Sequence, residues 1–394
     1  MKWKPIYITG ICCLAVGLVL CGAGVATGAL NEEKYAESLC LSETESVIYE
    51  DISSVNIHTD GYAAVILQSG AGDTARVEAT QLDDSRYDFK ASVENGTLKI
   101  SQREKSDNRY DNINMNFSGE NYNTIITVTL PEKTYNSIAI EDCGECTVKD
   151  INADSIKIEA DYGDCTLQGI TAAKCELSAD NGDCTVSDCT VSGNLNIDID
   201  YGDLTLTNTT AENISEIRNG CGEVYVNNSS FGSCKIEVDY GNISIAATDI
   251  AKALKAECEN GTATIDTLTC ASCEIELDYG NLFMTDYTET DSRTKSEFEV
   301  SCGDMEIKRS TLYNAKISLD YGDIETTDTR LYGATHIEAD CGNIDLNLSG
   351  SSNDYEIIER VSKKDKDKEN TVSDKNIISI EQNVGDTTVD FTEN

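Results

Sequence analysis

Tyrosine and acidic side chains recur together in this sequence, in a short motif that could bind a ligand. Five tetrapeptides of the form Asp-Tyr-Gly-Asp or Asp-Tyr-Gly-Asn carry the tyrosines Tyr162, Tyr201, Tyr240, Tyr279 and Tyr321. A tyrosine ring is an apolar body with a polar tip, which suits a half-solvated surface. We therefore expect either an aromatic stripe that contacts a ligand or a set of turn residues that cover one corner of the fold.

Acidic residues directly after the glycine of each repeat form a second set of candidates. They include Asp164, Asp183, Asp203, Asp304 and Asp323. Stacked in a regular fold, these carboxylates would stand about 4.8 Å apart, where repulsion is costly unless water, salt or a cation screens it. Calcium prefers oxygen ligands. The five aspartates are candidate calcium ligands, and the alternative is a solvated acidic edge.

Catalytic groups are sparse. His58 and His336 are the only histidines, and neither stands beside a serine or cysteine of a nucleophile motif. Carboxylates clustered with lysine or arginine could still cleave a polysaccharide. However, aspartate beside glycine suits a turn for structural reasons, because its side chain bonds its own backbone. We predict no catalytic residue and no cofactor, calcium excepted.

The 17 cysteines do not form the regular framework of a small disulfide-rich domain. Cys146, Cys165 and Cys184 stand at one position of successive repeats, where they would be about 4.8 Å apart. They are either small buried hydrophobes or partners in a bridge between neighbouring repeats. The pairs Cys143/Cys146 and Cys270/Cys273 are single instances and do not predict a zinc site.

A repeat of 19 to 20 residues must position these side chains. The glycines 144, 163, 182, 202, 222, 241, 261, 280, 303, 322 and 342 mark it. Residues two and four after each glycine, and five before it, are almost all apolar, whereas the residues between them are polar. This alternation indicates strands with one buried face. A turn of about 20 residues gives a perimeter of about 65 Å, which such side chains can fill.

The sequence therefore predicts an all-β fold, a parallel β-helix with turns, or rungs, of 19 to 20 residues. The predicted segments are a transmembrane anchor or signal segment (1–30), a linker (31–44), a β-rich N-terminal cap of antiparallel hairpins (45–131), the β-helix repeats (132–349), a charged loop (350–375) and a C-terminal rung (376–394). Residues 106–123 are expected to form a polar loop within the cap.

The N-terminal segment has no charged residue from Pro5 to Leu30, which is long enough to span a bilayer. Lysines precede it and acidic residues follow, so the N-terminus should be cytoplasmic and the body extracytoplasmic. Cleavage near 26–29, or lipidation at Cys21, are the alternatives to an uncleaved single-pass anchor. The net charge of −41 argues against nucleic acid or anionic lipid as a partner of the body.

The chain resembles the bacterial putative-adhesin domains with β-strand repeats, a family of unknown function. The likeness spans about residues 50–392 and rests on the apolar N-terminus, a strand ending in Leu130-Pro131, and repeats of the form Ile-x-Ile-x-x-x-x-Gly-Asp-x-x-Leu/Val. The resemblance implies a single-stranded right-handed β-helix exported by a Gram-positive bacterium, with some members linked to envelope stress.

These observations lead to one functional prediction with two alternatives. We predict a non-enzymatic, membrane-anchored, extracytoplasmic β-helix that acts as an adhesin-like or envelope-associated interaction module. Its partner would be an envelope glycan or protein, bound through the five tyrosines. The alternatives are a polysaccharide-active β-helix enzyme and a purely structural surface spacer.

Overall fold

The computed structural model describes residues 41–42, 47–60, 62–83, 87–105, 124–360 and 375–392. The predicted membrane segment, most of the linker and the expected loop at 106–123 lie outside these residues. Within the described ranges, no helix is long and apolar enough to cross a membrane. The only helical element there is a single 3-10 turn, η1 (Ser352–Asp354).

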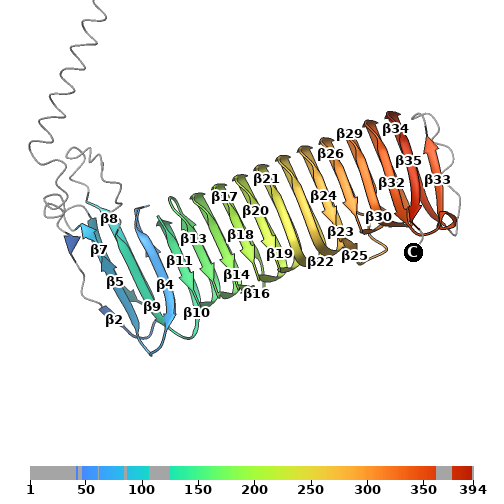
Figure 1. Ribbon diagram of the computed structural model, residues 1–394. Helices are drawn as coiled ribbons and strands as arrows, with labels where there is room; N and C mark the ends of the chain where they lie inside the picture. Colours follow the sequence, from blue (N-terminus) through green and yellow to red (C-terminus); the bar gives the residue numbers. More distant parts are fainter. Residues whose placement is uncertain are drawn as a thin grey trace, which may run out of the picture.

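The described chain is a stack of short parallel strands that runs along one axis (Figure 1). The N-terminal strands are β1 (Leu41–Ser42), β2 (Val47–Tyr49), β3 (Ser54–His58), β4 (Ala64–Gly70), β5 (Ala75–Thr80), β6 (Leu82–Asp83), β7 (Tyr87–Glu94), β8 (Thr97–Glu104) and β9 (Ile125–Pro131). The first repeats contain β10 (Thr134–Cys143), β11 (Cys146–Lys149), β12 (Asn152–Ala160), β13 (Cys165–Gln168), β14 (Thr171–Asn181), β15 (Cys184–Ser187), β16 (Thr190–Val191), β17 (Leu195–Tyr201), β18 (Leu204–Thr207) and β19 (Thr210–Cys221).

The same arrangement continues to the C-terminal end. The following repeats contain β20 (Val224–Asn227), β21 (Ser230–Tyr240), β22 (Ile243–Asn260), β23 (Ala263–Tyr279), β24 (Leu282–Thr285), β25 (Thr288–Glu289), β26 (Glu297–Cys302), β27 (Met305–Lys308), β28 (Thr311–Tyr313), β29 (Lys316–Tyr321), β30 (Ile324–Tyr332), β31 (Ala334–Cys341) and β32 (Ile344–Ser349). The last strands are β33 (Tyr355–Arg360), β34 (Asn376–Val384) and β35 (Thr387–Thr392). The predicted parallel β-solenoid is confirmed.

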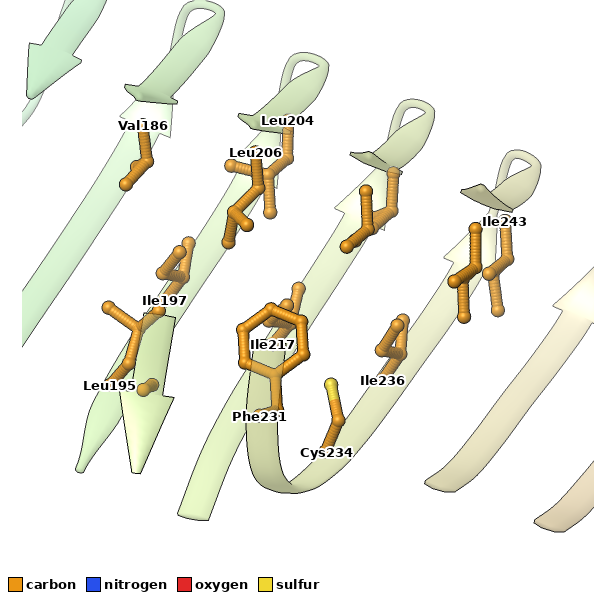
Figure 2. Packing of buried hydrophobic residues seen from close by; sticks show 14 of the residues in the cluster. Val186, Leu195, Ile197, Leu204, Leu206, Ile217, Phe231, Cys234, Ile236 and Ile243 are labelled. Atoms are coloured by element: carbon orange, nitrogen blue, oxygen red, sulfur yellow. The ribbon is translucent and has the colours of Figure 1, made fainter. Parts of the chain in front are cut away.

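The core is a continuous apolar column inside the tube (Figure 2). All residues two after a repeat glycine, from Cys146 to Ile344, are buried, as are those four after it and, from Ile158 to Ile337, those five before it. The parallel register places like positions side by side, for example Leu204 beside Val224 and Ile217 beside Ile236. Because each rung exposes apolar surface above and below, only stacking removes that surface from water.

The repeat glycines form one corner of every rung, and their backbones lie almost in contact. Gly222 has a φ of +149°, and a Cβ there would lie 1.9 Å from the carbonyl oxygen of Gly202. A φ in this region and the close approach both exclude a side chain. Glycine is therefore required by the stacking of the corners as well as by the turn.

A second corner lies six residues after each repeat glycine except Gly342. The residues there have left-handed backbones, with φ between 47° and 66°: Asp150, Gly169, Asp188, Asn208, Asn228, Ala247, Thr267, Asp286, Arg309 and Asp328. Aspartate and asparagine tolerate this conformation better than other side chains do. They are also linked between rungs, because Asn208 Nδ2 donates to Asp188 Oδ1 at 3.0 Å and Asn228 Nδ2 donates to Asn208 Oδ1 at 2.6 Å.

The N-terminal segment differs from the cap of antiparallel hairpins that we expected. Strands β3 and β4 form a parallel rung that lies between two others, because they pair with β8 and β9 on one side and with β10 and β11 on the other. Among the described residues, antiparallel pairing is confined to β1 with β6, β2 with β5, β5 with β9 and β7 with β8, and the Asn95-Gly96 turn closes the one hairpin, between β7 and β8. Parallel and antiparallel strands with one buried face show the same alternation of apolar and polar residues, so the sequence pattern could not tell the two kinds of pairing apart.

At the C-terminal end, β34 and β35 stack on β31 and β32 as one more rung. Strand β33 then pairs in parallel with β34. Of the segment expected to form a charged loop, residues 350–360 and 375 are described, and they contain η1 and β33.

Candidate binding edge

The five predicted tyrosines lie along one edge of the tube, beside the glycine corner. Their side chains are 55% to 62% exposed: Tyr162, Tyr201, Tyr240, Tyr279 and Tyr321. In the strand register, Tyr201 lies between Asn181 and Cys221, and Tyr279 lies between Asn260 and Cys302. A tyrosine therefore occupies every second rung, about 9.6 Å from the next along the stack. We call this column the tyrosine edge.

The side chains between these tyrosines are small. They are Asn181, Cys221, Asn260 and Cys302, and Cys341 follows the last tyrosine. Each pair of rings thus bounds a notch with a small residue at its centre. The alternation that gave the sequence its 39-residue period produces a regular row of such notches.

A sixth tyrosine extends the edge at its N-terminal end. The rings of Tyr62 and Tyr162 are stacked, with centroids 5.6 Å apart and planes 3° apart. They approach each other over Gly144, where an added Cβ would lie 3.2 Å from backbone atoms of both tyrosines. The preceding residue, Cys143, points into the core and leaves this space empty. Sequence analysis missed Tyr62 because it belongs to the segment before the regular repeat.

The acidic residues after the glycines have a structural role that the sequence did not reveal. Most of them accept a hydrogen bond from the backbone N–H of the residue at the same position on the next rung. Asp183 N donates to Asp164 Oδ1 at 3.0 Å, Asp203 N to Asp183 Oδ1 at 2.9 Å, and Asp323 N to Asp304 Oδ1 at 3.0 Å. Asparagines continue the series, since Asp304 N donates to Asn281 Oδ1 at 2.8 Å. We call this column the carboxylate ladder.

The ladder explains why aspartate and asparagine alternate at this position, because each supplies one oxygen acceptor for a backbone donor at an exposed corner. Glu223 instead accepts from Asn242 Nδ2 at 3.0 Å. Among the residues described, no group of three or more histidine, cysteine or acidic side chains is arranged to hold a metal ion. Calcium binding at Asp164, Asp183, Asp203, Asp304 and Asp323 stays a prediction.

A second acidic column lies on the other side of the tyrosines. It comprises the residues directly before them: Asp161, Asp200, Asp239, Asp278 and Asp320. Burial raises the pKa of Asp161, and so do the nearby carboxylates Asp142, Asp180 and Glu159. Within the described chain, neither this column nor the carboxylate ladder contains a basic residue or forms an ion pair. The tyrosine edge is therefore flanked by uncompensated negative charge.

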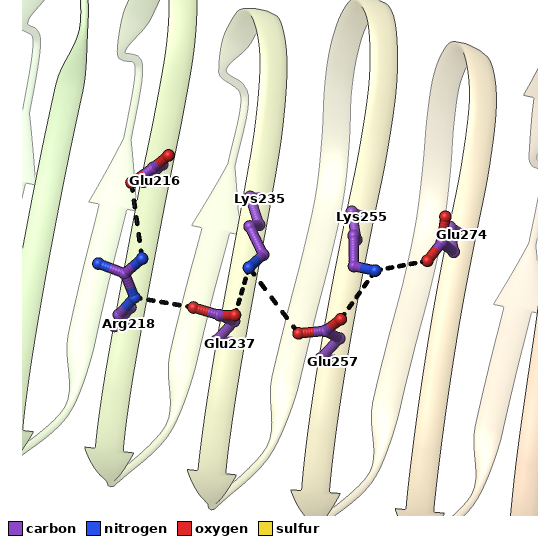
Figure 3. Close-up of polar contacts among 7 residues, drawn as sticks. All are labelled: Glu216, Arg218, Lys235, Glu237, Lys255, Glu257 and Glu274. Carbon is purple, nitrogen blue, oxygen red and sulfur yellow. Dashed lines mark hydrogen bonds and ion pairs between the residues drawn. The ribbon is translucent and has the colours of Figure 1, made fainter.

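Arg218, Lys235 and Lys255 of the middle rungs lie elsewhere, in a belt of ion pairs on the outer strand face (Figure 3). Arg218 Nε lies 2.8 Å from Glu237, and Lys255 lies 2.8 Å from Glu257 and 2.6 Å from Glu274. Lys235 pairs with Glu237 on the same strand. The Lys235 ammonium, followed by Arg218, lowers the pKa of Glu237. This belt, residues 216, 218, 235, 237, 255, 257 and 274, is largely neutralised internally.

A hollow of about 530 Å3 lies beside the belt. It opens at Gly220, which has no side chain where neighbouring rungs carry Asp200 and Asp239. Its charged lining is Asp198, Asp200, Arg218, Glu237, Asp239, Glu257, Glu259, Glu276 and Asp278. Carboxylates and an arginine thus meet in one concavity, but Arg218 is already paired with Glu237, and with Glu216 at 3.7 Å.

The cysteines of the repeats are free thiols. Cys146, Cys165 and Cys184 form the predicted ladder in the core, in direct parallel register. Burial raises the pKa of Cys175 and of Cys234 to about 12, so both thiols are protonated at neutral pH. The interpretation as small buried hydrophobes matches this structure.

The two histidines contact carboxylates, and in the strand register His58 lies beside Ser101 and His336 beside Ser379. His58 Nδ1 is 3.2 Å from Asp142 and His336 Nε2 is 3.9 Å from Glu338. Both are partly exposed side chains at the surface.

Comparison with known proteins identifies a family. The family model described as Toastrack DUF4097 matches residues 52–301 and 224–390, which together exceed half of the chain. No curated protein matches the chain.

Solved structures with some similarity come from bacteria. They include a putative adhesin from Bacteroides fragilis (11% identity), a putative cell adhesion protein from Clostridium sporogenes (10% identity) and a putative adhesin from Parabacteroides merdae (11% identity). Each alignment covers 89% of this chain and, in the same order, 98%, 100% and 96% of the other chain, with a TM-score of 0.19 in all three cases. At these TM-scores the likeness carries no argument, so the assignment rests on the family model.

Proposed function

This chain belongs to the Toastrack DUF4097 family, whose function is unknown, and it folds as the predicted β-solenoid. We propose that it is a non-enzymatic, adhesin-like interaction module. The observation that carries this proposal is the tyrosine edge. Five rings more than half exposed, at every second rung, place regular apolar surface in water. Exposed aromatic surface of this kind marks a contact site more often than a stability device.

The proposed location is the outer face of a bacterial cell membrane, with the tube projecting outward. The support is the uncharged stretch from Pro5 to Leu30 and the lysines before it. The N-terminus would be cytoplasmic, and a Gram-positive host follows only from the family resemblance. Protease treatment of intact cells tests this placement, because an outward-facing body is digested while a cytoplasmic reporter survives.

The binding proposal is tested with the full-length chain in neutral detergent and envelope fragments as the target. Tyr201, Tyr240 and Tyr279 are changed together to alanine, which removes the centre of the edge. The matched control changes Tyr225 and Phe283, which are 39% and 37% exposed on another face. We expect binding to fall in the edge variant and to persist in the control. Equal binding by both variants would refute the proposed site, and no binding by the wild type would favour a structural spacer.

A polysaccharide-active enzyme is a second candidate, favoured by the hollow at Gly220. There, Glu237 or Asp239 would act as acid or base, and Arg218 would hold an anionic sugar. Release of reducing ends from envelope polysaccharide is the test. Activity that Glu237→Gln and Asp239→Asn both abolish would establish this reading in place of the first.

A further inference from the structure

We propose that the tyrosine edge binds an extended cationic peptide segment that carries lysine or arginine at every third residue. This inference rests on the proposed function, namely that the edge is a binding surface, and adds the chemistry of the partner. It follows from three features of the edge: its charge, its spacing and the exposure of its rings.

The charge of the edge selects a cation. The tyrosines lie between two acidic columns that contain no basic residue, in a chain with a net charge of −41. Arg218, Lys235 and Lys255 show that the chain does use basic side chains on the same tube. It gathers them in the neighbouring belt, where glutamates occupy them. The edge therefore attracts a positive partner and repels anionic polymers of the envelope.

The spacing of the edge selects the conformation of that partner. Tyrosines at every second rung recur at about 9.6 Å. A polyproline II chain rises about 3.1 Å per residue with three residues per turn, so one face recurs at about 9.3 Å. A β-strand presents one face at about 6.6 Å, so it would miss one notch and return to register only at every second one. A side chain at every third residue of a polyproline II segment thus meets one notch after another.

The notches fit the end of a lysine or arginine side chain. Each lies between two exposed tyrosine side chains, has a small residue such as Cys221 or Asn260 at its centre, and is flanked by the two acidic columns. An ammonium or guanidinium group held over a ring face within about 6 Å gains a cation–π contact. For the notch between Tyr201 and Tyr240, Asp200 and Asp239 add charge at the rim.

The test uses synthetic peptides on the full-length chain in neutral detergent, read by fluorescence anisotropy. The probe has about four Arg-Pro-Ser repeats, one for each notch between the five tyrosines. One control has the same composition with its arginines gathered at one end, and a second has glutamine in place of arginine. We expect the periodic peptide to bind at least about tenfold more tightly than the gathered one, with affinity that falls as salt rises. Equal affinity for both cationic peptides would overturn the spacing argument.

Variants then assign the site. Changing Tyr201, Tyr240 and Tyr279 to alanine should weaken binding about tenfold, since each exposed cation–π contact is modest, whereas phenylalanine at these positions should preserve it. The Tyr225→Ala and Phe283→Ala control should bind as the wild type does. If the alanine variant keeps its affinity for the peptide, the inference is wrong.

Failure of this inference is distinguishable from failure of the proposed function. A neutral glucan oligosaccharide is titrated in parallel. If the glucan binds and the tyrosine variant loses it, while the periodic peptide does not bind, the edge is a binding site for a glycan and the cationic partner is excluded. If envelope fragments bind equally to wild type and tyrosine variant, both proposals fail.

Discussion

The backbone N–H of Asp203 donates a 2.9 Å hydrogen bond to Oδ1 of Asp183, its counterpart on the preceding rung. A carboxylate that looked like a candidate ligand thus completes the backbone pairing of the corner. We predict that Asp183→Ala lowers stability by about 1 kcal/mol, because the Asp203 donor loses its acceptor. Asp183→Asn keeps an oxygen acceptor and should cost much less. Thermal midpoints from circular dichroism check the pair, and equal losses in both variants would show that charge matters and the hydrogen bond does not.

Calcium should raise the thermal midpoint if the free oxygens of the carboxylate ladder also bind this cation. The screening of closely spaced carboxylates is the physical reason. Asp203→Asn retains the acceptor for Glu223 N but removes one charge, so its calcium-induced shift should be smaller. Magnesium at the same concentration is the control. If calcium leaves the thermal midpoint unchanged, the carboxylate ladder serves only to accept backbone hydrogen bonds.

Alanine at Gly222 should be strongly destabilising, by about 3 kcal/mol or more, because its Cβ would overlap the carbonyl group of Gly202 at 1.9 Å. Gly72 offers a matched control, since it has a φ of +129° but no atom within 4 Å of the Cβ position. Gly72→Ala should cost about 1 kcal/mol from backbone strain alone. Comparable losses at both sites would mean that the corners can separate to admit a methyl group.

Buried Glu289 should make stability depend on pH. It is 2% exposed, and burial raises the pKa of its carboxyl group even though Tyr313 N donates to Oε2 at 2.7 Å. The folded state therefore holds this proton more tightly than the unfolded state. Its contribution is full below the ordinary glutamate pKa and is lost as pH rises through the raised value.

Glu289→Gln should accordingly flatten the decline in the denaturation midpoint as pH rises from the ordinary glutamate range towards neutrality. The other acidic residues contribute equally to both proteins, so the difference between variant and wild type isolates Glu289. Parallel curves for the two proteins would contradict the prediction.

The repeat could be read from the sequence because burial and turn geometry act on single positions. The column from Cys146 to Ile344 is apolar for one reason, its place inside the tube, and Gly222 is glycine for one reason, its corner. The left-handed backbone of the second corner could not be read in the same way, because Asn208, Thr267 and Arg309 share it without sharing a side-chain type. The left-handed backbone at this corner is imposed by the stacking of rungs, and the sequence of one rung contains no sign of it.

The candidate site was predictable in part for a similar reason. The tyrosines recur in a motif, so their alignment along one edge followed from the period. Tyr62 joins them only through long-range pairing of β4 with β11, which the local sequence around Tyr62 does not encode. The hydrogen bonds of the carboxylate ladder likewise depend on the exact offset between rungs. The ion-pair belt combines residues from four strands, each with an ordinary alternation of charge.

The placement of β3 and β4 between two later segments has a consequence for how the chain folds. Thr59 Oγ1 donates to the carbonyl of Asp142 at 2.6 Å across 83 residues of sequence, whereas bonds along the carboxylate ladder span 19 to 23. Contacts of high sequence separation require more loop closure and form more slowly. The middle rungs can each add to a neighbour already formed, but the N-terminal rungs must wait for a distant partner. We therefore expect assembly to begin inside the stack and to finish at the N-terminal end, and pulsed hydrogen exchange would show late protection there.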